Sequence, residues 1–269
     1  MSLTDLFGGR TLCVALAPGQ LTALVRSGSR VVAGSATRIV FDPQEGHWQG
    51  ALDALAAYLG PQGTAPAGLP LSLGLSTRWC QLAVLPWSDA LLDEAGAQRF
   101  MEAQFAGIFG EVARAWTVRC DDAPYGQPRV ACALDRALVD GLHALAAEHG
   151  RRCVALESLL PIAWRAIAAT GPRAFALVEP GRLVLAATMG GRIVAVQAQA
   201  LRGAWHAELP QAWRRWTLRA PELGEIAQVA LVNLDADAAP APVPAGFFAA
   251  PSASTLTPPF AAVAMVGLR

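Results

Sequence analysis

The chain has 269 residues, a formal net charge of zero and 54% apolar residues. This length and apolar content are enough for one large domain or two ordinary ones with a sizeable core. The balanced charge gives no reason to expect nucleic acid or an anionic membrane as a partner. All 21 basic residues are arginines, which excludes a phosphate-loop lysine, a Schiff-base lysine and a lysine general base.

The cysteines and histidines form no recognisable metal or redox motif. The five cysteines are odd in number, contain no C-x-x-C pair and lie mostly in apolar runs, which favours buried free thiols in a reducing cytoplasm. The four histidines lack the His-x-x-x-His spacing of a metalloprotease. These residues are Cys13, Cys80, Cys120, Cys132, Cys153, His47, His143, His149 and His206. We expect neither a metal nor a cofactor.

No targeting or membrane-spanning segment is predicted. The N-terminal sequence MSLTDLFGGR contains an acidic residue and no apolar stretch, so we expect no signal peptide. Two long stretches, 54–77 and 238–268, lack charge but contain several prolines, whereas a spanning helix needs about 20 uninterrupted apolar residues. We interpret the first stretch as a linker and the second as an irregular tail.

In chain order, the first half predicts strands and helices that alternate. A helix over about 48–59 is ended by Gly60-Pro61, and Ser88 is the expected N-cap of the long helix that follows it. The predicted strands lie at about 11–17, 21–26, 30–41, 69–75, 79–85, 116–120, 129–134 and 152–156. The predicted helices lie at about 48–59, 89–109, 135–150 and 158–169.

The second half begins at Gly171-Pro172 and predicts fewer elements. Three strands are expected at 174–178, 183–188 and 192–201. A helix over about 209–219 follows, with Pro210 in its first turn, where proline is tolerated. One more strand is expected at 226–234. Little regular structure is predicted after it.

An internal repeat links the two halves. The stretch 18–33 reappears without a gap 162 positions later, as 180–195. Each copy lies in a pattern of apolar strand, Pro-Gly turn, apolar strand, Gly-containing turn and apolar strand. A β-meander that recurs after more than half of the chain predicts two lobes built on one plan, and it argues against a single barrel or sandwich.

The order strand-strand-strand-helix-strand-helix, present twice, resembles the actin-like, ribonuclease H-type superfamily of two-lobed proteins. Within it, the chain resembles PilM of type IV pili and the cytoplasmic domain of GspL of type II secretion. The sequence RWCQLAVLP at 78–86, before a long helix, is similar to the subdomain inserted in lobe one of these proteins. The run VACALDRALVD at 130–140, continuing to VALE at 154–157, is similar to their pattern of strand, helix, glycine and a strand with an acidic end.

The resemblance implies a mixed α/β fold of two ribonuclease H-like lobes, an actin-like ATPase fold with a truncated second lobe. Lobe one would span 1–170, with an added subdomain at about 78–120. Lobe two would span 171–235, and an Ala/Pro-rich irregular tail would span 236–269.

The phosphate-binding turns of ATP-binding relatives are altered. Those relatives carry Asp-x-Gly-Thr/Ser at the first strand turn and a second Gly-rich Asp turn in lobe two, where backbone N–H groups cradle phosphates and carboxylates place Mg²⁺. Here the first turn, ALAPGQ at 15–20, has no carboxylate, and Pro18 lacks an amide donor. In the second, Glu179 could hold a metal through water, but Pro180 again removes a donor. We interpret Glu179 as a solvated turn residue and expect no catalytic, cofactor-binding or metal-binding residues.

Other motifs have structural explanations. SLGLS at 72–76 lacks the G-x-S-x-G pattern of a nucleophile elbow. Asp121-Asp122, beside a Pro/Gly turn, is typical of solvated turn formers, and His143 and His149 are expected on a helix surface. WRRW at 213–216 could stack on a nucleotide or anchor a protein interface. The simpler interpretation is that its tryptophans face the lobe-two sheet and its arginines face water.

Three hypotheses for function remain. The favoured one is a non-catalytic actin-like scaffold or docking subunit of a bacterial pilus- or secretion-type inner-membrane platform. The second is a degenerate actin-like ATP-binding protein or weak ATPase switch, and the third is a relative of sugar or acetate kinases. The missing phosphate-turn carboxylates argue against the second and third.

The resemblance also implies a partner, a cytoplasmic segment of an inner-membrane protein of the same machine. It implies that the chain does not bind nucleic acid and does not insert into the membrane itself. The chain would lie in the cytoplasm, at the inner membrane through that partner, and a homo-oligomer is left open. We expect the segment to dock between the strand 79–85 and the helix 89–109, because apolar grooves accept short peptides as strands or helices.

Overall fold

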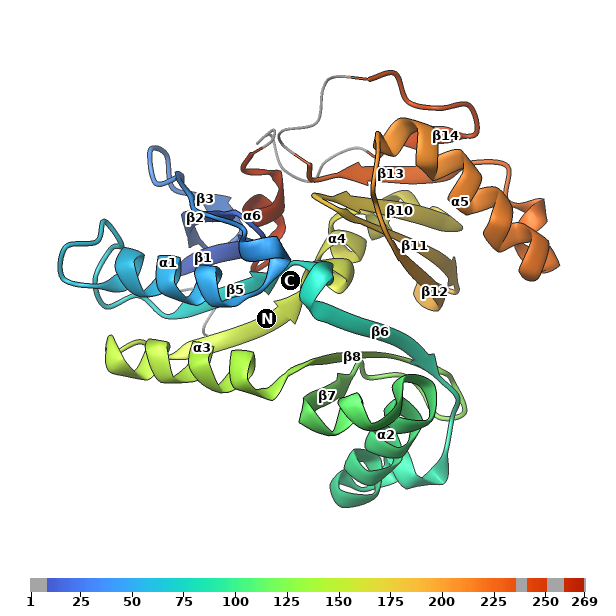
Figure 1. Cartoon of the computed structure of the whole chain (residues 1–269), viewed down its shortest axis with the longest axis horizontal. Helices are drawn as coiled ribbons and strands as arrows, with labels where there is room; N and C mark the ends of the chain where they lie inside the picture. Colours follow the sequence, from blue (N-terminus) through green and yellow to red (C-terminus); the bar gives the residue numbers. More distant parts are fainter. Residues whose placement is uncertain (1–8, 236–240, 251–258, 269) are drawn as a thin grey trace.

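The computed structural model describes residues 9–235, 241–250 and 259–268. Two sheets with their covering helices lie side by side, and a smaller sheet with one long helix lies below the junction between them (Figure 1). We refer to the first two units as lobe one and lobe two, and to the third as the subdomain. We propose that the lobes meet at Gly171-Pro172, between α4 (Leu159–Ile167) and β10 (Ala174–Glu179).

The lobe-one sheet has the strand order β3-β2-β1-β5-β9, and β4 pairs with β2. Strand β1 is antiparallel to β2 and parallel to β5. Alternate side chains of β1 point to opposite faces: Leu12 and Val14 pack under helices α1 and α3, whereas Cys13 and Ala15 face α4. The bounds are β1 Arg10–Ala17, β2 Gln20–Ser27, β3 Arg30–Val31, β4 Thr37–Val40, β5 Leu71–Leu75, β9 Cys153–Ser158, α1 Gln49–Leu59 and α3 Arg136–Glu148.

The lobe-two sheet repeats this plan, with the order β12-β11-β10-β13-β14. In both sheets the first strand is antiparallel to the second and parallel to the strand that follows the first helix, β5 in lobe one and β13 in lobe two. The Pro-Gly turns occupy equivalent positions, and Gly19 and Gly181 both have positive φ, 78° and 69°, which glycine adopts without steric cost. The predicted duplication is therefore confirmed. The remaining bounds are β11 Arg182–Met189, β12 Arg192–Ala200, β13 Val229–Asn233 and β14 Phe247–Ala249.

Lobe two is the shorter lobe. Its long helix is α5 (Trp205–Arg219), since the later α6 (Ala261–Met265) packs on lobe one, and the described residues between β13 and β14 form no helix. Helix α5 begins four residues earlier than predicted, so Pro210 lies in its interior. The reason is local: the Glu208 carboxylate accepts hydrogen bonds from the backbone N–H groups of Arg202 and Gly203, which holds the chain at the start of the helix.

The tail that we predicted as irregular contains regular structure in its described parts. Strand β14 extends the lobe-two sheet, and α6 packs against β1, β2 and α4. The buried side chain of Arg26 in β2 donates from Nε to the Val266 carbonyl at 3.0 Å and from Nη2 to the Ala264 carbonyl. The prediction of an irregular tail failed because the uncharged run AAVAMV at 261–266 packs into a hydrophobic core against lobe one.

The subdomain is a three-stranded antiparallel sheet in the order β6-β8-β7. Its strands are β6 Cys80–Leu85, β7 Trp116–Cys120 and β8 Arg129–Asp135, and its helix is α2 Glu94–Phe109. The predicted limit near residue 120 is too early, because the central strand β8 follows it. Ser88 caps a short 3₁₀ turn instead of the long helix, and Asp93 caps α2 by accepting from the Gly96 N–H at 2.8 Å.

Candidate functional site: the interlobe junction and the adjoining cavity

Glu179 lies at the end of β10, between the two lobes. Its side chain is only 1% exposed, so our interpretation of a solvated turn residue is wrong. Its Oε2 accepts hydrogen bonds from the backbone N–H of Thr77, at 2.9 Å, and from the Thr77 hydroxyl. Thr77 opens the 3₁₀ turn η3 (Thr77–Trp79) after β5. The contact therefore joins lobe two to lobe one, and it is a long-range contact that the local turn sequence could not reveal.

The side chain of Arg78 occupies the space beside the second Pro-Gly turn. Its Nη1 donates to the carbonyl of Gly181 at 3.2 Å, and its Nη2 donates to the carbonyl of Glu45 at 3.4 Å. A Cβ atom at Gly181 would lie 2.7 Å from Arg78 Nη1, so a larger residue would displace the guanidinium, and the φ of 69° independently favours glycine here. The second Pro-Gly turn is thus in contact with a guanidinium group from lobe one.

Burial dominates the electrostatics of this junction. It raises the pKa of Glu179, while hydrogen bonds from Thr77 and Ser76 and the charge of Arg182 act in the opposite direction. Burial also lowers the pKa of Arg182, which the nearby Glu179 partly offsets. The carboxyl group is thus held mainly by uncharged donors. Among the described residues, no three His, Cys, Asp or Glu side chains are grouped as metal ligands.

The space between β6 and α2, where we expected a docking cleft, is a packed core. Leu85 of β6, Met101 and Phe105 of α2 and Val118 of β7 belong to one hydrophobic cluster, and each is at most 5% exposed. A peptide could enter only by displacing α2. The predicted location is wrong because the large side chains of α2 are spaced to cover the sheet.

The opposite face of the same sheet borders a cavity of about 640 Å³. Side chains alternate along a strand, so Leu85 faces α2 while Leu82, Val130 and Cys132 line the cavity. The other walls come from α3, the end of β9, α4 and the β11–β12 turn of lobe two. The cavity thus lies where the subdomain, lobe one and lobe two meet.

Two ion pairs lie at the cavity wall. Arg192 Nη2 is 2.6 Å from Asp121 Oδ2, and Arg165 Nη1 is 2.8 Å from Glu157 Oε2. The first pair fastens the lobe-two turn to the subdomain. The indole N–H of Trp164 in α4 holds the same turn, by donating to the Gly191 carbonyl at 3.3 Å.

The two neighbouring carboxylates Asp121 and Asp122 have different surroundings. Asp121 also accepts from the Val130 N–H at 2.8 Å, and burial raises its pKa while Arg192 lowers it. It is therefore a half-buried bridging residue, contrary to our interpretation of a solvated turn former. The side chain of Asp122 is fully exposed, as expected.

The remaining sequence candidates lie close to the simpler interpretations, although Cys120, Cys132 and Cys153 are only half-buried and His149 follows the last residue of α3. All five cysteines are free, and burial raises the pKa of Cys13 to about 11, so its thiol stays protonated. In α5, Trp216 is buried against the lobe-two core, whereas Arg214 and Arg215 are exposed. His143 is exposed on α3, where it also lines the cavity. No helix in the described part of the chain is long and apolar enough to cross a bilayer.

Sequence reasoning did not identify Thr77, Arg78, Trp164 and Arg192 as site residues. Arg192 was visible only as the repeat partner of Arg30. Arg78 was noted only as the start of the run RWCQLAVLP, and Thr77 and Trp164 carry no motif, because each of the three acts through a contact with the opposite lobe.

No protein-family model and no curated protein matches this chain. Several solved structures, however, match the chain in fold. The chain is similar to the cytoplasmic domain of EpsL, an inner-membrane component of the type II secretion system of Vibrio cholerae, with a TM-score of 0.59 at 11% identity, over 95% of this chain and 93% of that one. It is similar to the PilM–PilN type IV pilus biogenesis complex, with a TM-score of 0.57 at 13% identity, over 83% and 81% of the two chains.

A third similar structure is a Bacteroides thetaiotaomicron protein of unknown function with an actin-like ATPase fold. Its TM-score is 0.52 at 11% identity, over 86% of this chain and 94% of that one. These identities are too low to carry a function, but the shared architecture covers most of each chain. Together with the repeated strand order, it shows that this chain has the actin-like ATPase fold, built from two ribonuclease H-like lobes with a truncated second lobe.

Proposed function

We propose that this chain is a non-catalytic, actin-like docking subunit of a secretion- or pilus-type platform at the bacterial inner membrane. It binds a cytoplasmic segment of an inner-membrane protein of the same machine and is held at the membrane, on the cytoplasmic side, through that partner. The similarity in fold to an inner-membrane secretion component and to a pilus biogenesis complex supports this role.

The contacts at the interlobe junction support a role without nucleotide. Both Pro-Gly turns lack one amide donor, and the carboxylate of Glu179 is engaged by Thr77. The guanidinium of Arg78 contacts the Gly181 carbonyl. A phosphate would therefore meet fewer donors than a phosphate-binding turn offers.

The cavity between the subdomain and the two lobes is the proposed docking site. Its volume of about 640 Å³ lies within the range of roughly 300–1,000 Å³ that is typical of ligand sites. An apolar strand face forms one wall, and the pairs Arg192–Asp121 and Arg165–Glu157 place charge at its edges. An apolar wall with a few fixed polar groups suits a short peptide, whose side chains enter the cavity while its main chain bonds at the edge.

Binding of cytoplasmic segments of inner-membrane proteins encoded by neighbouring genes tests the proposal. Thr117 is half-buried on β7 and lines the cavity, whereas Ala103 is exposed on α2 of the same subdomain. We expect Thr117→Trp to lose the segment in pull-down and calorimetry, and Ala103→Trp to retain it. Equal binding by both variants would exclude the cavity, and failure of the wild type to bind any such segment would count against the docking role.

A further inference from the structure

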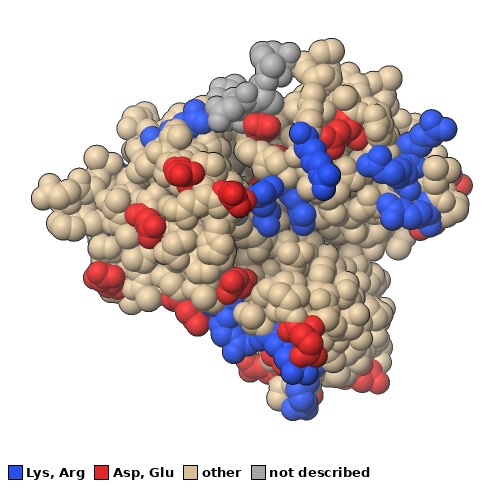
Figure 2. Space-filling view, viewed as in Figure 1, with Lys and Arg blue, Asp and Glu red and all other residues tan. Residues whose placement is uncertain are grey.

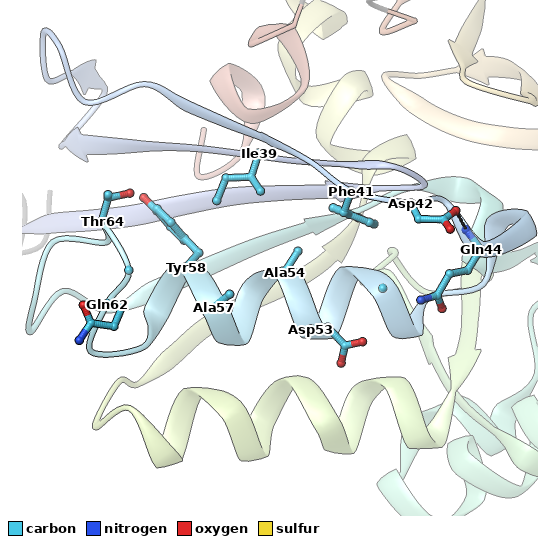
Figure 3. Close-up of a pocket in the computed structure, with 12 residues that line it drawn as sticks. Ile39, Phe41, Asp42, Gln44, Asp53, Ala54, Ala57, Tyr58, Gln62 and Thr64 are labelled. Atoms are coloured by element: carbon cyan, nitrogen blue, oxygen red, sulfur yellow. Dashed lines mark hydrogen bonds between the residues drawn. The ribbon is translucent and has the colours of Figure 1, made fainter.

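A second groove, of about 500 Å³, runs along α1 of lobe one (Figure 3). Ile39 of β4 and Phe41 give it an apolar floor, and Ala54 and Ala57 of α1 leave it open because neither has a side chain beyond Cβ. The groove extends along most of the helix, from Gln44 at one end to Gln62 and Thr64 at the other (Figure 3).

This groove is acidic. Asp42 and Asp53 line it, and none of its lining residues is Arg, Lys or His. Asp42 Oδ1 accepts from the Gln44 N–H at 3.0 Å, and Asp53 Oδ1 accepts from Gln49 Nε2 at 3.1 Å. Neither carboxylate forms an ion pair within the described part of the chain. An occupant with cationic groups around an apolar side chain would match both the floor and the charge.

The exposed face of α5 in lobe two has this character. Leu218 is 74% exposed; Arg214 and Arg215, four and three positions before it, neighbour it on the helix surface, and Arg219 follows it on the flank that it shares with Arg215. Arg215 and Arg219 donate to neutral amide oxygens of β12, at 3.2 and 3.1 Å. None of the three pairs with a carboxylate among the residues that the structure describes. Basic side chains gather at this end of the molecule (Figure 2).

The two surfaces lie at opposite ends of the molecule. Helices α1 and α5 are equivalent in the duplicated plan, since each lies between the antiparallel strands of its lobe and the strand parallel to the first, and they lie at the two ends of the long axis (Figure 1). Complementary surfaces at opposite ends of one chain cannot close on each other within that chain. Between copies they generate head-to-tail contacts, which form rings or open filaments.

We propose that a second copy of this chain places its α5 face in the α1 groove. Leu218 then lies on the apolar floor, and the surrounding arginines lie against Asp42 and Asp53. An anionic bilayer would also attract the arginines, but it would leave the acidic groove without a partner, so the two surfaces together favour a second copy. This inference does not depend on the proposed docking function.

One helix in one groove buries little area. Stable interfaces bury roughly 1,200–2,000 Å², so we expect an association that is weak and concentration-dependent. Because its charges lie at the surface, we also expect salt to weaken it. Sedimentation velocity of the whole chain over a concentration series, at low and at high salt, is the suitable measurement.

Two variants test the head-to-tail geometry. Arg215→Glu/Arg219→Glu reverses the α5 face and leaves the groove intact, whereas Ala57→Trp fills the groove and leaves the face intact. We expect the wild type to exceed the mass of a dimer and each variant alone to stay monomeric. Their equimolar mixture should stop at a dimer, because the intact α5 face of one variant can bind only the intact groove of the other. All substituted side chains are exposed, and Ala103→Trp on α2 is the matched control, expected to assemble like the wild type.

Several outcomes would overturn the proposal. A wild type that stays monomeric at every concentration would do so, as would variants that assemble like the wild type or a mixture that stays monomeric. Co-sedimentation with anionic phospholipid vesicles tests the alternative that the α5 face binds a bilayer. A wild type that stays monomeric but binds vesicles, and loses that binding in Arg215→Glu/Arg219→Glu, would assign the α5 face to lipid.

Discussion

Glu179 of lobe two and Thr77 of lobe one are joined by two hydrogen bonds that end on the same carboxylate oxygen. The backbone N–H of Thr77 lies 2.9 Å from that oxygen, and the Thr77 hydroxyl supplies the second donor. Together with the bond from Arg78 to Gly181, this contact joins the two lobes of the chain directly.

Substitutions at Glu179 should separate the carboxyl group's charge from its hydrogen bonds. Glu179→Gln keeps an oxygen acceptor and removes the charge, so we expect the free energy of unfolding at pH 7 to stay the same or to rise. Glu179→Ala leaves the buried Thr77 N–H without its acceptor, which costs about 1–3 kcal/mol. Urea unfolding of both variants is the measurement, and an equal loss in the two would show that the charge itself is needed.

The pH dependence of the same residue has a definite sign. Burial raises the pKa of Glu179 in the folded state above its unfolded value of about 4.3. Its contribution to stability is therefore fully present below the unfolded pKa and is lost as the pH rises through the folded pKa. In Glu179→Gln this decline should be absent from the unfolding curves above pH 4. A decline that persists unchanged would assign it to other groups.

Nucleotide binding should be weak. With one donor missing from each turn, we expect Mg-ATP to bind no tighter than about 1 mM, which corresponds to about −4 kcal/mol. Calorimetric titration measures this. Arg78→Ala removes the guanidinium from the turn but restores neither missing amide, so we expect it to bind no tighter than the wild type. A micromolar dissociation constant, or hydrolysis that Glu179→Ala abolishes, would favour the ATPase hypothesis.

The fold was largely predictable because its signals are local and occur twice. The Pro-Gly turns and the apolar strands beside them recur with a constant offset, and the observed registers place Ala17 opposite Gln20 and Glu179 opposite Arg182. The tail was missed for the opposite reason. Its apolar run is core because it packs against residues of β1, β2 and α4, and Arg26, more than 200 positions away, binds its carbonyl groups.

The site was less predictable than the fold. A buried carboxylate and a solvated one look alike in a Pro-Gly turn, and only the contact between Glu179 and Thr77 distinguishes them. The docking location failed for a related reason. The alternation of β6 gives its side chains two opposite faces, but the sequence does not say which face α2 covers, and Leu85 proved to lie beneath the helix.

Arg26 should be essential for the C-terminal segment. Arg26→Met keeps the apolar stem of the side chain but leaves the carbonyls of Ser29, Ala264 and Val266 without this donor. We expect a loss of about 2–4 kcal/mol in the free energy of unfolding, since unsatisfied buried groups cost about 1–3 kcal/mol each and some will regain water. Arg30→Met, at an exposed position of β3, is the matched control. Increased hydrogen exchange confined to α6 would locate the effect, and unaltered stability would contradict the assigned role.

The contact between Arg192 and Asp121 should matter more for docking than for stability. Because the pair is partly exposed, with side-chain exposures of 25% and 39%, removing it by Arg192→Ala should cost no more than about 1 kcal/mol of unfolding free energy. Yet the pair holds the β11–β12 turn of lobe two against the subdomain, and that turn is one wall of the cavity. A released turn must be ordered again when a segment docks, which subtracts from the binding free energy.

We therefore expect the affinity of Arg192→Ala for the docked segment to fall about three- to tenfold, which corresponds to roughly 1 kcal/mol. Fluorescence anisotropy of a labelled segment measures this. Arg173→Ala, an exposed arginine of lobe two outside the cavity lining, is the control and should bind like the wild type. Unchanged affinity in Arg192→Ala would show that lobe two does not take part in docking and would confine the site to lobe one and its subdomain.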